Sequence, residues 1–221
     1  IKYIFKLLIP FILMITESIL NNKKIILDNF NKGKFEKVIK LGKKFLKKNN
    51  DFQVLYALGV TNLTLKDYLE AEKFFRSIIS LKPNAENYYI YGNIQKQLKN
   101  YNEASEYFLK AINLKFDYSE AYNNLGNTKF RLGFIDEAVK NYKKAIKFNK
   151  KNFPAYFNLA HVYSEEKNFD ELKKVLQEIL KFDENNTTAL NDLGYLNLIL
   201  GYVDEGRKLF EKVINIDDKH I

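Results

Sequence analysis

The sequence predicts an all-α fold built from antiparallel helix pairs, and three observations support this prediction. Short blocks that contain a small residue begin at Leu58, Tyr91, Leu125, Leu159 and Leu193, at spacings of 33, 34, 34 and 34 residues. Within each period the apolar residues recur twice at helical spacing. Each pair of apolar runs is separated by a short turn that leaves room for a tight reversal. Each period therefore holds two helices that run in opposite directions.

Composition places the chain among ordered globular or repeat proteins. Its 221 residues are 46% hydrophobic and 29% charged, with no long Gly, Pro or Ser tract. The absence of cysteine excludes disulfides, thiolate zinc sites and cysteine nucleophiles. Neither His161 nor His220 stands in a metal-ligand spacing, and no phosphate-binding glycine loop or triad pattern occurs. We therefore expect no catalytic residue, no metal and no cofactor, so that these residues form no enzyme by themselves.

The net charge of +9 suggests nucleic acid as a partner, but the distribution of the charge along the chain argues against a nucleic-acid partner. Residues 1–50 carry twelve lysines against Glu17, Asp28 and Glu36, which accounts for the whole excess. The remaining residues balance, with 24 basic and 24 acidic side chains. Arginine, which suits bidentate phosphate and base contacts, occurs three times, at Arg76, Arg131 and Arg207. No nucleic-acid partner is expected.

Fixed offsets from each block repeat the same residue types. The position twelve residues after the small residue of each block holds Ala71, Ala104, Ala138, Leu172 and Gly206. Four residues further on stand Phe75, Phe108, Tyr142, Leu176 and Phe210. Three residues beyond these stand Ile78, Ala111, Ala145, Ile179 and Val213. Small and bulky side chains thus alternate in register along five copies.

This pattern resembles the tetratricopeptide repeat, a helix-turn-helix unit of 34 residues, over about residues 19–221. The resemblance implies a right-handed superhelical solenoid of antiparallel helix pairs. It also implies that small residues let the helices approach closely. Those in the first helices are Gly59, Gly92, Gly126, Ala160 and Gly194, and those in the second helices are Ala71, Ala104, Ala138, Ala111 and Ala145.

The register divides the chain into repeats at 52–84, 85–118, 119–152, 153–186 and 187–221, after a degenerate first copy at 19–51. Leu172 stands at a position that is usually Ala, so the fifth unit is predicted to pack more loosely or at an altered angle. In the fourth unit Asp136 is predicted to cap the second helix. The sequence stops where a further repeat would begin, and we interpret it as a piece of a longer protein.

Residues 1–18 form a separate apolar segment with three open interpretations. A nine-residue apolar run from Leu7 to Ile15 is too short to span a bilayer, which takes about 20 residues. The segment is interpreted as a helix that packs on the first repeat, as a signal-like sequence, or as a membrane anchor. The lysines that follow it oppose export, so a cytoplasmic location is expected, with a membrane-associated or exported protein as the alternative. If the chain contacts a membrane, the contact is expected to involve residues 1–50 alone.

The family resemblance also implies a concave groove lined by the first helix of each unit. On this chain the groove positions are Asn93, Asn123, Asn124, Asn127, Asn158, His161, Asn191 and Asp192. Asn124, Asn158 and Asp192 share one register and are predicted to form a ladder. Side-chain amides both donate and accept hydrogen bonds, so they suit contact with a peptide backbone.

The expected function is a scaffold that binds a protein or peptide segment in this groove. The alternative is a substrate-binding arm of a larger enzyme, because the asparagine-rich repeats look similar to those preceding glycosyltransferase domains of the O-linked N-acetylglucosamine transferase type.

Overall fold

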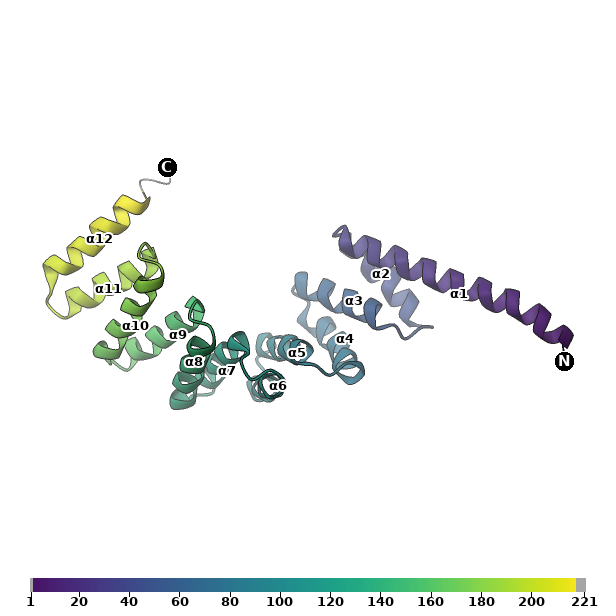
Figure 1. Cartoon of the computed structure of the whole chain (residues 1–221), viewed down its shortest axis with the longest axis horizontal. Helices are drawn as coiled ribbons and strands as arrows, with labels where there is room; N and C mark the ends of the chain where they lie inside the picture. Colours follow the sequence, from purple (N-terminus) through teal and green to yellow (C-terminus); the bar gives the residue numbers. More distant parts are fainter. Residues whose placement is uncertain (1, 218–221) are drawn as a thin grey trace. The chain divides into compact units, whose positions relative to one another are not determined.

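A computed structural model describes the backbone of residues 2–217 and the side chains of residues 13–216. The described backbone forms twelve α-helices and no strand, which confirms the predicted all-α repeat of helix pairs (Figure 1). In chain order the helices are α1 (Lys2–Asn31), α2 (Phe35–Leu46), α3 (Phe52–Thr64), α4 (Tyr68–Leu81), α5 (Ala85–Gln97), α6 (Tyr101–Leu114), α7 (Ser119–Arg131), α8 (Ile135–Phe148), α9 (Phe153–Glu165), α10 (Phe169–Phe182), α11 (Thr187–Ile199) and α12 (Val203–Asp217). Residues 218–221, which the last predicted repeat includes, lie outside the described residues.

The helices fall into two compact units. The first unit ends at Tyr107 and the second begins at Phe108, so the boundary lies within α6. Each unit has its own buried core. In the first unit, Val38, Phe45 and Leu58 belong to one buried cluster, and Phe75 and Tyr91 belong to a second.

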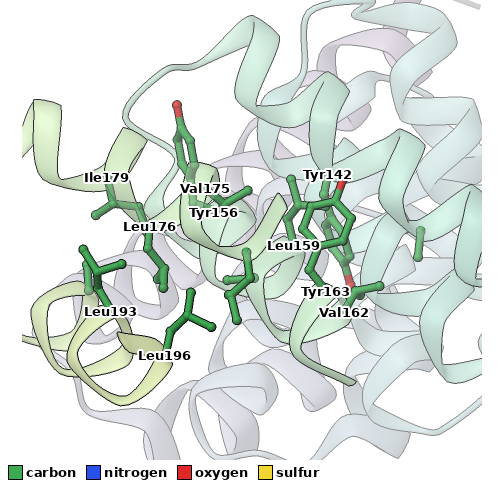
Figure 2. Close-up of a cluster of buried hydrophobic side chains, with 14 residues drawn as sticks. Tyr142, Tyr156, Leu159, Val162, Tyr163, Val175, Leu176, Ile179, Leu193 and Leu196 are labelled. Atoms are coloured by element: carbon green, nitrogen blue, oxygen red, sulfur yellow. The ribbon is translucent and has the colours of Figure 1, made fainter. Parts of the chain in front are cut away.

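The second unit buries a continuous cluster that joins α8, α9, α10 and α11 (Figure 2). Tyr142, Tyr156, Leu176 and Leu196 are among its members, and each is almost completely buried. Because these side chains come from successive helices, each helix pair covers the apolar face of the next pair.

Every turn between the two helices of a pair has the same conformation within the described residues. Gly33, Gly133 and Gly201 have positive φ angles there, and so do Lys66, Lys99 and Lys167. In each turn the amide after this residue donates to a carbonyl five residues earlier, as from Phe134 N to Lys129 O over 2.9 Å. This is the Schellman arrangement, which satisfies carbonyls at the end of the first helix. Lysine at such a position carries a steric cost that glycine avoids.

Caps at the helix N-termini follow a less regular pattern than the turns. The carboxylates of Asp51 and Asp67 accept hydrogen bonds from backbone amides at the starts of α3 and α4. The prediction that Asp136 caps α8 is wrong. The cap position is Phe134, which makes no side-chain cap hydrogen bond, and Asp136 lies inside the first turn. At this position the positive end of the helix dipole still stabilises the negative charge of the carboxylate.

The first helix of a pair meets the second where a glycine faces an aromatic ring. A Cβ atom added to Gly126 would lie 2.6 Å from a ring carbon of Tyr142. The same substitution at Gly59 would meet Phe75 at 2.7 Å, and at Gly194 it would meet Phe210 at 2.9 Å. These distances are shorter than carbon atoms tolerate, so a side chain at any of these glycines would push the pair apart.

The pair of α9 and α10 departs from this arrangement. Ala160 replaces the glycine of the first helix, and Leu172 replaces the alanine that usually faces it. Both residues are buried, yet α9 and α10 pack less extensively against each other than α7 and α8 do. This agrees with the looser packing predicted for the fifth unit.

Helix α1 is one continuous helix, so its backbone does not break at the boundary predicted at residue 18. Its first half projects beyond α2 and α3, and its second half contacts both (Figure 1). Leu13, Met14 and Ile15 are exposed and therefore do not cover the first repeat. The prediction that residues 1–18 pack on the first repeat also concerns residues 1–12, whose side chains lie outside the described ones. No helix within the described residues has the length and apolarity needed to cross a bilayer.

We predict that Gly126→Ala destabilises the protein, because the new Cβ would lie 2.6 Å from the ring of the buried Tyr142, so that the ring or its helix must shift. The expected loss is about 1–3 kcal/mol in the free energy of unfolding, typical of overpacking. The measurement is urea unfolding followed by circular dichroism. Gln177→Ala, on an exposed face of α10, is the control for an alanine substitution that meets no neighbouring ring and should shift stability by less than about 0.5 kcal/mol. Equal stability of wild type and Gly126→Ala would contradict the close approach.

Candidate functional site

The predicted groove residues lie on the first helices of their pairs. Asn93 is half-buried on α5 in the first unit, and the other predicted residues lie on α7, α9 and α11 in the second. Asn123 is buried, at 9% exposure. Asn124, Asn127, Asn158 and Asn191 are half-buried, and His161 and Asp192 are exposed.

Two of these asparagines bind each other. Asn158 Nδ2 on α9 donates to Asn123 Oδ1 on α7 over 2.9 Å. The expected ladder would align Asn158 with Asn124, so the observed partner is shifted by one residue. Because Asn123 is buried and one donor of Asn158 is occupied, this pair has less capacity to hold a peptide than two solvated amides would have.

A third asparagine is engaged in helix packing. Asn127 Oδ1 accepts a hydrogen bond from the Tyr142 hydroxyl over 2.8 Å, which ties α7 to α8. Burial raises the pKa of the Tyr142 phenol, so this hydroxyl stays protonated and donates at neutral pH. Asn127 therefore fixes the ring that faces Gly126.

The predicted packing residues are all buried. They are Gly59, Gly92, Gly126, Ala160 and Gly194 in the first helices, and Ala71, Ala104, Ala138, Ala111 and Ala145 in the second helices. Their burial places them between helices, and Ala160 also lines the cavity described next.

A cavity of about 560 Å³ opens between α9 and α11, with α10 at its base. We call it the α9–α11 cavity. Helix α9 contributes residues spaced three or four apart, and so does α11, as expected where one face of each helix lines a groove. The lining residues are Phe157, Ala160, His161, Ser164, Glu165, Phe169, Leu172, Thr188, Asp192, Tyr195, Leu196 and Ile199.

Apolar side chains form most of this lining and several remain exposed. Tyr195 and Ile199 are 66% and 63% exposed, which is unusual for large side chains that share one helix face. Phe157 and Phe169 are partly buried against the core below. Exposed apolar groups at the mouth of a cavity are a common feature of binding surfaces.

The charged groups of the cavity are acidic, apart from a histidine. His161 Nε2 lies 3.8 Å from Glu165 Oε1, and its ring contacts Phe130 edge-on at 5.6 Å between centroids. Asp192 makes no hydrogen bond or ion pair with any described residue. Although Asp192 remains partly exposed, desolvation by the surrounding side chains raises the pKa of its carboxyl above the ordinary value. The ionised Asp192 is therefore less well solvated than an ordinary surface aspartate.

Sequence reasoning identified His161 and Asp192 but missed the rest of the cavity. Tyr195 and Ile199 follow Asp192 at spacings of three and seven residues, so a helical projection from Asp192 would have found them. Phe169 and Leu172 lie on the second helix of the pair, where no groove residue was expected. Leu172 was noticed as a departure from the family pattern.

We predict that Asn158→Ala lowers the free energy of unfolding by about 0.5–1.5 kcal/mol, because it leaves the buried Asn123 oxygen without its donor. Asn191→Ala is the control, since Asn191 is half-buried on α11 and makes no hydrogen bond within the described chain. Urea unfolding of both variants measures the difference. Equal stability of the two variants would show that the amide pair contributes nothing.

We predict that Asp192→Asn does not destabilise the protein at pH 7 and adds a small stabilisation. The pKa of Asp192 is higher in the folded than in the unfolded chain, so ionisation disfavours folding. The penalty is present above the folded-state pKa and disappears as pH falls below the ordinary value of 3.8. The advantage of the variant should therefore shrink as pH is lowered from 7 toward 4. Destabilisation by Asp192→Asn at pH 7 would mean that the carboxylate has a stabilising partner.

Comparison with known proteins assigns the repeats to one family. The family model described as "Tetratricopeptide repeat" matches residues 52–84, 153–186 and 187–220, and the model described as "TPR repeat" matches residues 92–133 and 126–166. A search of curated proteins found no match.

Solved structures share the fold at low sequence identity. A crystal structure of MamA is 23% identical, covers 74% of this chain and 96% of its own, and superposes with a TM-score of 0.66. The C-terminal part of a TPR repeat-containing protein from Cytophaga hutchinsonii is 16% identical, covers 89% and 80%, and has a TM-score of 0.76. YrrB, described as a TPR protein with an unusual peptide-binding site, is 19% identical, covers 81% and 93%, and has a TM-score of 0.60. With repeat models matching most of its length, the chain belongs to the tetratricopeptide-repeat family.

Proposed function

We propose that the chain is a scaffold that binds a peptide or protein segment, and that the α9–α11 cavity is where the segment docks. The observation that carries this proposal is the cavity itself. Its volume of about 560 Å³ falls within the range of about 300–1,000 Å³ typical of ligand sites. Membership of the family and the likeness to YrrB, which is described as having a peptide-binding site, support a peptide as the ligand.

The lining suits a peptide side chain better than a small polar molecule. Phe157, Tyr195 and Ile199 offer aromatic and aliphatic surface, while Ser164 and Thr188 offer hydroxyl groups at the edge. Aromatic anchors in a partly desolvated pocket contribute most of the affinity in protein interfaces. Because the two opposing walls come from rigid helices, the cavity would take a segment with little reorganisation.

The second function considered, a substrate-binding arm of a glycosyltransferase-type enzyme, stays a prediction. No contact among the described residues distinguishes an enzyme substrate from another peptide.

We predict that Ile199→Gln weakens peptide binding about tenfold or more, because burying an isoleucine side chain contributes about 1.5–3 kcal/mol. A phage-displayed peptide library selects ligands on the full chain, and titration of a selected synthetic peptide compares the variants. Ile214→Gln is the matched control, since Ile214 is similarly exposed, at 58%, but lies on α12 outside the cavity. Equal loss of affinity in both variants, or in neither, would place the peptide elsewhere.

A further inference from the structure

We propose that the α9–α11 cavity is selective for a segment in which a bulky apolar side chain neighbours an arginine or lysine. This proposal rests on the proposed function of the same cavity and adds the chemistry of the ligand. It follows from two features of the lining, namely its apolar surface and the sign of its charge.

The apolar part of the cavity requires an apolar partner. Tyr195 and Ile199 are exposed on one face of α11, opposite Phe157 on α9. A bulky side chain placed between these walls would remove apolar surface of both partners from water. A fully polar segment would instead desolvate its own groups without gaining hydrogen bonds from this surface.

The charge of the cavity is opposite to that of the chain. The chain has 36 Lys and Arg against 27 Asp and Glu, yet no Lys or Arg lines the cavity. Its acidic residues are Glu165 at the end of α9 and Asp192 on α11. Apolar walls lower the effective dielectric around these carboxylates, which strengthens their attraction for a cation.

Asp192 is the group that would gain most from a ligand cation. It has no hydrogen-bond or ion-pair partner among the described residues, and the burial that raises its pKa makes its charge costly without one. An ammonium or guanidinium group beside it would provide the missing partner. Glu165 already lies near His161, so it is the weaker attraction of the two.

An acidic segment has a different surface available to it. Lys140, Lys143, Lys144 and Lys147 gather around a shallow cavity on α8 in the same unit. A ligand that carries carboxylates would prefer this basic face to the α9–α11 cavity. The preferred ligand charge therefore distinguishes the two surfaces.

The test uses three fluorescein-labelled synthetic dodecapeptides of Gly and Ser that differ at one residue. Each carries one phenylalanine followed by arginine, by citrulline, which is the neutral isostere of arginine, or by glutamate. Fluorescence anisotropy measures their binding to the full chain and to Asp192→Asn. Asp204→Asn is the control, because Asp204 is an exposed carboxylate on α12 outside the cavity.

Wild type should bind the arginine peptide about three- to tenfold more tightly than the citrulline peptide. Asp192→Asn should lose this preference and bind the arginine and citrulline peptides with equal affinity, and Asp204→Asn should retain the preference. Raising the salt concentration should reduce the preference in wild type.

Other outcomes overturn the proposal in distinguishable ways. Equal binding of the arginine and citrulline peptides, with sensitivity to Ile199→Gln, would refute the cation preference and leave the proposed function standing. Tighter binding of the glutamate peptide would locate the ligand on the basic face of α8. Absence of binding by all three peptides, together with library ligands that are insensitive to Ile199→Gln, would refute both this proposal and the proposed function of the cavity.

Discussion

The close contact between a glycine on the first helix of a pair and an aromatic ring on the second is the constraint on which the repeat depends. Gly59 with Phe75, Gly126 with Tyr142 and Gly194 with Phe210 repeat this contact in three pairs. Because the glycine has no side chain, the ring lies against the backbone of the first helix. The hydroxyl of Tyr142 then reaches Asn127 on that helix and fixes the ring in place. Each pair can therefore present one consistent apolar face to its neighbour.

The candidate site lies where this constraint is relaxed. Ala160 and Leu172 occupy the positions of small residues in the pair of α9 and α10, and both line the α9–α11 cavity. The bulkier Leu172 stands where the other full repeats have alanine or glycine, and α9 and α10 pack less extensively against each other than α7 and α8 do. The residues that depart from the repeat pattern in this pair thus also line the surface on which we base a function.

The helix pairs could be predicted from the sequence because small and aromatic residues recur in register. This pattern depends only on packing inside a pair. The contacts between the first helices of neighbouring pairs were harder to predict from the sequence. Asn158 donates to Asn123, a pair that the predicted ladder did not include, because the partner depends on the offset between two helices, which a repeat period does not define. The positive φ angles of Lys66, Lys99 and Lys167 were not predicted, since lysine gives no sign of this conformation. His161 and Asp192, which were predicted from the groove positions of the family, line the α9–α11 cavity.

The most direct measurement is the location of a bound peptide on the second unit. NMR can follow the backbone amide shifts of the isotope-labelled chain during titration with the phenylalanine–arginine dodecapeptide. The shifts that change would map the peptide's location residue by residue. We expect the largest changes at residues 157–165 of α9 and 188–199 of α11, with Asp192 and Ile199 among them. Changes confined to the lysine face of α8 or to the first unit would contradict a binding site in the α9–α11 cavity.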